Sequence, residues 1–245
     1  MISIIIPSFN AESTIKKTIL SITDQSVDKV QYEIIVIDGQ STDSTMDVLK
    51  AYKDEIDVLV SEPDAGIYDA MNKGIKVAKG EWIYFLGADD VLYNTSVLSE
   101  VSEKLNTTNA DIIYGDVVKT PSQTVYDGKF NAYKMVFKNI CHQAIFYHKS
   151  VFANHGTYIA DYTINADWEF NFKTMLSGVR FQYIPLTVAY FNENGASGTR
   201  QDIAYEIRRK EFFGQLPLWA KFCFKFRKTF WMKWYSKNFL NFEYA

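Results

Sequence analysis

Residues 62–90 read EPDAGIYDAMNKGIKVAKGEWIYFLGADD, a helix pattern followed directly by a strand pattern. Gly80 separates the two, because glycine commonly stops a helix. After it, an apolar run reads as a buried strand and closes with two adjacent aspartates, Asp89 and Asp90. Since unpaired carboxylates are costly to bury, this pair indicates a helix cap, a surface turn or a divalent-metal site. The apolar residues of the helix pattern recur at helical spacing, at Ile67, Met71, Ile75 and Ala78.

The same alternation of strand and helix precedes this stretch. Helix patterns lie between three further strand patterns, at residues 3–7, 32–38 and 57–62. The order βαβαβαβ predicts an α/β fold, a Rossmann-like, mainly parallel sheet with flanking helices. Ligands of such sheets bind at the carboxyl ends of the strands. Asn10, Asp38 and the two aspartates Asp89 and Asp90 all follow predicted strands, so we expect them to meet at one edge of the sheet.

The loop after the first strand, PSFNAEST (7–14), contains no glycine-rich phosphate-binding motif. A dinucleotide-binding protein would show G-x-G-x-x-G here, and a P-loop protein G-x-x-x-x-G-K-[ST]. A diphosphate ligand then needs another counter-charge, and a divalent cation held by one or two carboxylates is the usual substitute. A nucleotidyltransferase also combines a parallel sheet with metal-binding carboxylates, but it normally carries a basic glycine-rich loop at this position. That alternative and a non-catalytic nucleotide- or carbohydrate-binding protein both stay open.

Four segments together resemble, in order and spacing, the GT-A-fold glycosyltransferases of family 2. They are SIIIPSFN (3–10), IVIDGQSTDST (35–45), the block 62–90 and NADWEF (165–170). The similarity covers roughly residues 1–200 and is closest to bacterial members that build surface polysaccharides such as O-antigen, capsule or exopolysaccharide. It implies an inverting enzyme that moves a hexose or N-acetylhexosamine from a UDP-sugar to a lipid-diphosphate-linked saccharide acceptor. It does not imply nucleic-acid binding.

The resemblance also implies roles for individual residues on the donor side. It places a uridine pocket at Pro7, Phe9, Asn10, Glu12 and Asp38. This chain departs from the family pattern after the second strand, where Gly39 replaces a second acidic or amide residue and Gln40 replaces a glycine. A turn aspartate is the alternative explanation for Asp38.

The central block corresponds to the loop and helix start that line the nucleotide. The residues implied there are Asp64, Gly66, Asp69 and Asn72. An ordinary first-turn aspartate that responds to the helix dipole explains Asp69 nearly as well. At the strand end, Asp89 would contact ribose or metal, and Asp90 would ligate Mg²⁺ or Mn²⁺ bridging the diphosphate. No third metal ligand is identifiable.

The second half of the chain corresponds to the acceptor side. The resemblance makes Asp167 the general base, while a structural alternative makes it the N-cap of a helix over residues 168–176. His142 and Gln143 match a position bordering the acceptor, although a lone histidine is more often an ordinary core or loop residue. Arg200 would reach the diphosphate from a loop that closes over the donor, or belong to a plain surface loop.

The last part of the chain differs in charge from the rest. Residues 212–242 contain six basic, no acidic and twelve aromatic residues, whereas the whole chain of 245 residues has a net charge of −3. We therefore divide the chain into a catalytic domain (1–205, with a donor half 1–115 and an acceptor half 116–205) and a basic aromatic helical tail (206–245). The tail suits an anionic membrane surface, but a helix pair closing the core or a dimer interface is the alternative.

The remaining composition indicates where the protein works. No apolar stretch reaches membrane-spanning length and the start lacks the basic region of a signal peptide, so we expect a cytoplasmic protein peripheral to the inner face of the membrane. The two cysteines, Cys141 and Cys223, lack metal-ligand spacing and receive no chemical role. The oligomeric state stays open, and a homo-oligomer is one possibility.

Overall fold

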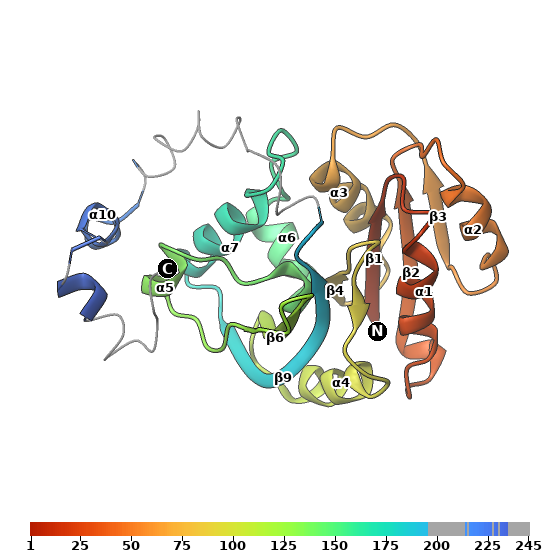
Figure 1. Ribbon diagram of the computed structural model, residues 1–245. Coiled ribbons are helices and arrows are strands. Elements are labelled where there is room, and N and C mark those ends of the chain that lie inside the picture. The colour runs from red at the N-terminus through yellow and green to blue at the C-terminus, as the bar shows by residue number, and fades with distance from the viewer. Residues whose placement is uncertain (196–213, 215, 227, 230, 235–245) are drawn as a thin grey trace.

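The computed structural model describes residues 1–195, 214, 216–226, 228–229 and 231–234 (Figure 1). Its strands are β1 (Ile2–Ser8), β2 (Tyr32–Asp38), β3 (Val58–Ser61), β4 (Trp82–Phe85), β5 (Val91–Leu92), β6 (Ile112–Thr120), β7 (Val125–Tyr126), β8 (Ile145–His148) and β9 (Phe181–Asn192). Its α-helices are α1 (Ile15–Thr23), α2 (Thr45–Ala51), α3 (Ile67–Val77), α4 (Val97–Thr107), α5 (Ala132–Met135), α6 (Lys149–His155), α7 (Ala166–Leu176) and α10 (Leu218–Phe226). Two short 3-10 helices are η1 (Lys29–Gln31) and η2 (His142–Ala144).

The first four long strands form the parallel part of the sheet, in the order β3-β2-β1-β4. β1 and β2 are buried along their whole lengths, since helices cover both faces of the sheet. Such strands read as continuous apolar runs, which is why SIIIP and YEIIVID predicted them correctly. The register pairs Ser8 at the end of β1 with Asp38 at the end of β2, so the loops that follow these strands start side by side.

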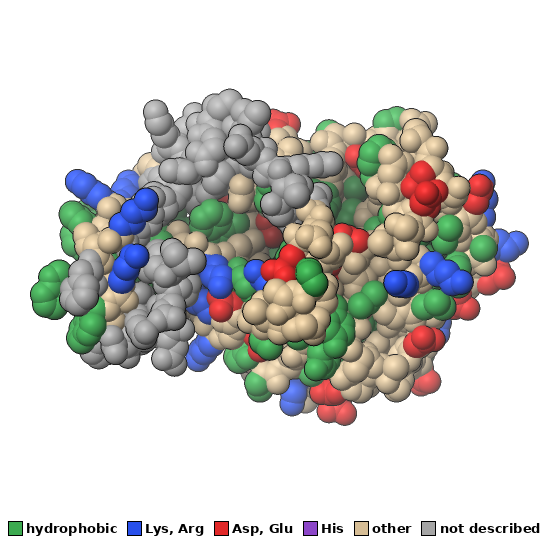
Figure 2. Space-filling model, in the orientation of Figure 1, with side chains coloured by type: hydrophobic (Ala, Val, Ile, Leu, Met, Phe, Trp, Pro, Cys, Tyr) green, Lys and Arg blue, Asp and Glu red, His purple; other side chains and the backbone are tan. Residues whose placement is uncertain are grey.

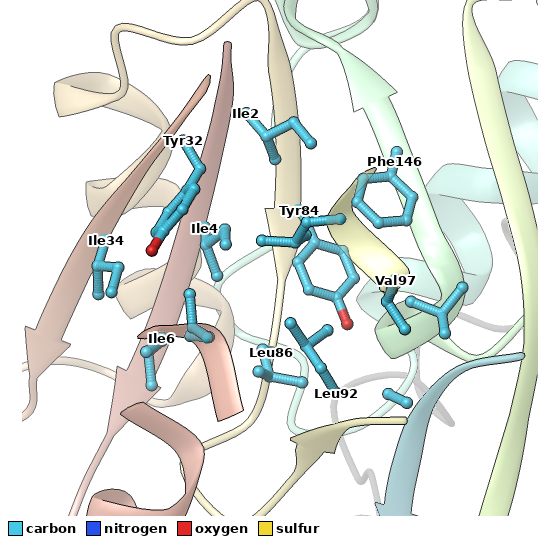
Figure 3. Packing of buried hydrophobic residues seen from close by; sticks show 14 of the residues in the cluster. Ile2, Ile4, Ile6, Tyr32, Ile34, Tyr84, Leu86, Leu92, Val97 and Phe146 are labelled. Carbon is cyan, nitrogen blue, oxygen red and sulfur yellow. The ribbon is translucent and has the colours of Figure 1, made fainter. Parts of the chain in front are cut away.

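Alternate residues of β1 point into two separate core clusters. Ile4 and Ile6 belong to one cluster together with the apolar faces of α1 and α4. Figure 3 shows these two side chains beside Tyr84 and Leu86, which follow the same alternation on the next strand segment. Ile5 points to the other face and packs with residues of α3, α6 and α7. The period of two along the strands thus divides the core between the two layers of helices.

Beyond β4 the sheet changes direction. β8 pairs antiparallel with both β4 and β6, β6 then pairs parallel with β9, and β9 pairs antiparallel with β5. The register of β6 against β9 shifts next to Gly115, where an added Cβ would lie 2.3 Å from the carbonyl oxygen of Leu186. The predicted boundary between the halves, at 115/116, therefore falls inside one continuous strand, and the division into halves stays a prediction.

The described part of the tail contains one helix, α10. Leu216 before it and Ala220 within it are buried in the cluster around α6 and α7, so one side of α10 packs against the domain. Leu218 and Phe222 point outward and are 83% and 59% exposed. None of the helices in the described segments is long and apolar enough to cross a membrane. The predicted boundary at 205/206 lies outside the described residues.

Candidate active site

The turn after β2 holds Asp38 in place. Asp38 is fully buried and accepts hydrogen bonds from the Ser41 backbone N–H (3.0 Å), the Ser41 hydroxyl (2.5 Å) and the Ser61 hydroxyl (2.7 Å). Asn10 joins the same turn, because its backbone N–H donates to the Ser41 hydroxyl and its side-chain oxygen accepts from the Thr42 N–H. The structure thus brings Asn10 and Asp38 together, as expected from the parallel sheet. The turn role of Asp38 is shown, and its contact with uracil stays a prediction.

The other members of the implied uridine pocket lie around this turn. Pro7 is buried inside β1, whereas Phe9 is 60% exposed directly beyond the strand. Glu12 accepts a hydrogen bond from the Ser44 backbone N–H at 2.8 Å. Of these residues, Phe9 offers a free apolar surface to a planar ligand, while Pro7 has no such surface.

The surroundings of Gly39 explain why this position departs from the family pattern. A Cβ at this position would lie 2.4 Å from Oδ2 of Asp64, so the carboxylate of Asp64 occupies the space of the missing side chain. Asp64 in turn accepts a hydrogen bond from the Gly66 backbone N–H at 3.0 Å, and burial raises its pKa above the usual value. Gly66 has a φ of 124°, which favours glycine at the start of α3. An acidic group is therefore present next to Asp38, supplied from position 64 instead of position 39.

Asp69 and Asn72, the two residues of α3 that were expected to line the nucleotide, make different contacts. Asp69 lies 3.3 Å from the ammonium group of Lys73 and accepts a hydrogen bond from the Ala65 N–H. Asn72 is buried, and its amide donates to the Tyr158 carbonyl and accepts from the Tyr158 N–H. Both ends of the Asn72 side chain thus hold the backbone of another segment. The structure does not bring Asn72 to an open ligand surface.

The two adjacent aspartates at the end of β4 have opposite environments. Asp90 is 2% exposed, and its carboxylate accepts from the Gln143 amide (2.6 Å) and from the Asn192 backbone N–H (2.9 Å). Burial first, and then the neighbouring charge of Asp89, raises the pKa of Asp90 to about 6. Asp89 is exposed, and the Asn192 amide donates to its Oδ2 at 3.0 Å. Asp89 is therefore the carboxylate of this pair that is open to a ligand.

Asp167 lies in the first turn of α7 and not at its N-cap, which is Asn165. The helix begins at Ala166, so the predicted capping role of Asp167 is wrong. The Asp167 carboxylate is 5% exposed and accepts from the Tyr68 hydroxyl (2.7 Å) and the Asn139 amide (2.8 Å).

One cavity unites the two sides of the site. It has a volume of about 280 Å³ and is lined by Asp89, Asp90 and Asp167 together with His142 and Gln143. The predicted donor-side carboxylates and the predicted base thus share one space, although they are far apart in sequence. The implied uridine residues do not line this cavity, and neither do Asp64, Gly66, Asp69 and Asn72. Arg200 lies outside the described residues.

Several residues of this cavity were not predicted from the sequence, because nothing in their local sequence indicates a site. Tyr68 sits on the apolar side of α3 and reads as core, Asn139 lies in an unpatterned loop, and Asn192 is the last residue of β9. The Cys141 thiol also lines the cavity and donates to the Gln143 amide oxygen at 2.8 Å. Gln143 itself holds Asp90, so its contact is with the donor-side carboxylate rather than with open acceptor space.

The surroundings of Asp89 fit a divalent cation. No cluster of three or more His, Cys, Asp or Glu side chains suited to a metal occurs within the described segments. Mg²⁺ and Mn²⁺ sites for diphosphates need no such cluster, because one or two carboxylates, phosphate oxygens and water complete the coordination. Gly87 and Gly195 leave space around the Asp89 carboxylate. A Cβ on Gly87 would lie 3.1 Å from Oδ1 of Asp89, and a Cβ on Gly195 would lie 2.8 Å from its Oδ2.

Comparison with known proteins places this architecture in a family. The family model described as Glycosyl transferase family 2 matches residues 3–162. A PGL/p-HBAD biosynthesis glycosyltransferase of Mycobacterium tuberculosis is 35% identical over 224 residues, which cover 89% of this chain and 84% of the relative.

Two solved structures share the fold. The structure of Staphylococcus aureus TarS in complex with UDP-GlcNAc superimposes with a TM-score of 0.76 at 18% identity, over 89% of this chain and 67% of that one. A mannosyltransferase of Pyrobaculum calidifontis, in complex with GDP-Man and Mn²⁺, superimposes with a TM-score of 0.64 at 20% identity, over 87% and 63% of the chains. The α/β sheet with flanking helices is thus a GT-A fold, and the chain belongs to glycosyltransferase family 2.

Proposed function

We propose that this enzyme is an inverting glycosyltransferase that moves a hexose or N-acetylhexosamine from a UDP-sugar to a lipid-diphosphate-linked saccharide. Such a reaction serves the synthesis of bacterial surface polysaccharides such as the O-antigen of lipopolysaccharide. One observation carries the proposal: an exposed carboxylate at the end of β4, Asp89, and a hydrogen-bonded carboxylate on α7, Asp167, face the same cavity. Inverting transfer needs these two groups on opposite sides of the reacting sugar carbon.

The donor would lie along the carboxyl ends of β1, β2 and β4. Phe9 and the turn of Asn10 and Asp38 would contact the base, and Asp64 with the N-terminus of α3 would contact the ribose. A bound Mg²⁺ or Mn²⁺ would act as a Lewis acid that stabilises the departing UDP. Asp89 would hold this cation, and Arg200 would approach the diphosphate from its loop.

The sequence predicted Asp90 as the principal metal ligand, and the geometry favours a different role. Both oxygens of Asp90 already accept hydrogen bonds, from Gln143 and from the Asn192 backbone. These bonds tie the turn after β4 to η2 and to the end of β9, directly beside Asp89. We therefore assign ligation to Asp89 and the positioning of this corner to Asp90.

Asp167 would act as the general base. A carboxylate can accept the proton of the acceptor hydroxyl as that oxygen attacks the anomeric carbon. The Nδ1 atom of His142 lies 3.7 Å from Oδ2 of Asp167, too far for a hydrogen bond and near enough to share one acceptor hydroxyl with it. His142 would thus border the acceptor.

The tail would bring the enzyme to the inner face of the cytoplasmic membrane. Figure 2 shows hydrophobic and basic side chains together over α10. Leu218 and Phe222 are exposed there, beside Lys221 and Lys225, and the sequence of residues 212–242 contains no acidic residue. Apolar side chains that enter the headgroup region and lysines that meet anionic lipid are typical of a membrane-binding helix.

A double charge reversal, K221E/K225E, tests the membrane role in the full chain. Binding to vesicles of phosphatidylglycerol and phosphatidylcholine in equal amounts should weaken, because each lysine contributes about 1 kcal/mol at such a surface. The matched control is K16E/K17E, which reverses two exposed lysines of α1. Equal binding of both variants and the wild type would contradict the membrane role and leave a core or dimer contact as the role of the tail.

A donor screen tests the catalytic proposal directly. UDP-glucose, UDP-galactose, UDP-GlcNAc, UDP-GalNAc and GDP-mannose should be incubated with the enzyme in Mn²⁺ and in EDTA, and nucleotide release measured. We expect release from one UDP-sugar, dependent on the metal. Release from GDP-mannose alone would overturn the assignment of uridine, and equal release from the UDP-sugar in EDTA and Mn²⁺ would overturn the metal site.

A further inference from the structure

The carboxylate of Asp167 is held by three hydrogen-bond donors from different parts of the chain. The Tyr68 hydroxyl (2.7 Å) and the Trp168 backbone N–H (2.9 Å) donate to Oδ1, and the Asn139 amide donates to Oδ2 (2.8 Å). The single proton of Tyr68 is shared with the Ile164 carbonyl, which lies just before α7. Tyr68 therefore fixes both the carboxylate and the backbone that leads into its helix.

A second layer of buried groups orients Asn139. Its side-chain oxygen accepts from the Asn171 amide at 3.2 Å, and the Asn171 oxygen accepts from the Tyr147 hydroxyl at 2.8 Å. Asn171 and Tyr147 are fully buried. Because an ionised carboxylate only accepts hydrogen bonds, Asn139 must turn its NH₂ group to Asp167 and its oxygen to Asn171. The chain of bonds thus specifies one orientation for each amide.

The lone pairs of the Asp167 carboxylate that accept no hydrogen bond indicate which oxygen can take the proton of the acceptor hydroxyl. An ionised carboxylate offers about four acceptor positions. Two on Oδ1 and one on Oδ2 are filled by the three donors, which leaves one position on Oδ2. That oxygen is also the one nearest His142 on the wall of the cavity. An acceptor hydroxyl can therefore reach the base at Oδ2 without displacing an existing bond.

We propose that Tyr68 and Asn139 are positioning residues that aim Oδ2 of Asp167 at the acceptor hydroxyl. The inference rests on the proposed function, in which Asp167 is the general base. Tyr68 adds a second consequence, since it belongs to the first turn of α3, two residues after Gly66 and four after Asp64, which is proposed to lie on the donor side. Its hydroxyl connects the helix that would line the donor to the carboxylate that would activate the acceptor.

The substitutions Y68F and N139A test the proposal, because each removes one hydrogen-bond donor to Asp167, and Y68F does so with little change in shape. We expect kcat for sugar transfer to fall about 10- to 100-fold, because a base misplaced by about 1 Å costs that much. The affinity for UDP should stay within about threefold of the wild type. The matched control is Y114F, because the Tyr114 hydroxyl is equally buried but bonds the backbone of Phe130. A loss of UDP affinity equal to the loss of kcat would overturn the proposal.

A double-mutant cycle separates positioning from a general structural role. In a D167N background, Y68F should cause no further loss of transfer rate, because the group it positions is no longer a base. Losses that multiply in Y68F/D167N would show that Tyr68 acts independently of Asp167. If Y68F reduces the thermal stability far more than Y114F, the same cycle is carried out with N139A, which then tests whether its effect depends on Asp167.

A measurement without turnover distinguishes failure of this inference from failure of the proposed function. The carboxyl carbon resonance of Asp167, followed by ¹³C NMR at one neutral pH, should move in Y68F and N139A and stay unchanged in Y114F. An unchanged resonance in both variants would overturn the positioning role. If the wild type turns over no nucleotide sugar while the resonance moves, the proposed function fails and the positioning of Asp167 stands.

Discussion

The two predicted sides of the site, the donor side and the acceptor side, hold their carboxylates in different ways. Asp38 is fixed by its own turn, through Ser41 three residues away, and by Ser61 on the adjacent strand. Asp167 is fixed by Asn139 and by Tyr68, which is 99 residues away in sequence. The first arrangement is local to neighbouring strands and the second exists only after distant segments have packed. Local turns produce recognisable motifs, whereas long-range contacts of the second kind leave almost no sequence pattern.

Asp90 and Asp167 show how the two sides are joined. Each is buried, and each accepts a hydrogen bond from a side-chain amide of the same short segment, from Gln143 and Asn139 respectively. His142 lies between these two amides on the cavity wall. Segment 139–143 therefore sets the separation of the two buried carboxylates. Substitutions on the donor side and on the acceptor side should therefore affect different measurements: the rate of transfer, the metal-dependent affinity for UDP, or the stability of the fold.

The largest effect is expected for D167N. The side chain keeps its shape but loses the ability to accept a proton, so kcat for transfer should fall by about 10²- to 10⁴-fold. UDP binding, measured by calorimetry, should stay unchanged because Asp167 belongs to the acceptor side. An active D167N enzyme would remove Asp167 from the role of base. If neither the wild type nor D167N transfers sugar, the result favours a non-catalytic binding protein.

The next effect is expected for D89N, on the donor side. Loss of an open carboxylate should weaken Mn²⁺-dependent UDP binding by at least about 10-fold, the cost of disturbing even an outer-shell partner of a metal. Binding of UDP in EDTA should change little. If D90N weakens the Mn²⁺-dependent affinity more than D89N does, then Asp90 is the principal ligand after all.

A stability effect of about 3 kcal/mol is expected from Asp90. Its folded pKa, about 6, lies above the usual value of 3.8 for an aspartate, so the folded state binds the proton more tightly. The resulting stabilisation is complete below pH 4 and is lost as the pH rises through 6. Urea unfolding of wild type and D90N between pH 4 and pH 7.5 should show this dependence in the wild type and a flatter curve in D90N. Parallel curves would contradict the effect of burial.

The smallest effect is expected for G39A. The added Cβ would displace the Asp64 carboxylate, which otherwise lies 2.4 Å from that position, and weaken its bond to Gly66. Loss of one such contact is worth roughly 1 kcal/mol, so UDP affinity should fall about fivefold. G214A is the control, because a Cβ at that position meets no other atom within 4 Å. An unchanged affinity in G39A would exclude Asp64 from the nucleotide site.

Much of the site was predictable because strand ends of a parallel sheet meet at one edge. The helix and strand patterns around Gly80 located Asp89 and Asp90, and the resemblance of NADWEF located Asp167 in the same cavity. The different environments of Asp89 and Asp90, one exposed and one buried, were not predictable. Adjacent residues of one motif differ only in what packs against them, and here the amide of Gln143 and the backbone of Asn192 select Asp90 for burial.

The amino-acid sequence by itself determined the α/β architecture, the family and the two groups of acidic residues. These follow from periodicity and short motifs, which are properties of neighbouring residues. Only the tertiary structure decided that Asn72 holds the Tyr158 backbone, and that Tyr68 and Asn139 hold Asp167. The physical reason is that a hydrogen bond depends on the direction of two side chains in space. That direction is settled by packing across the core and not by spacing along the chain.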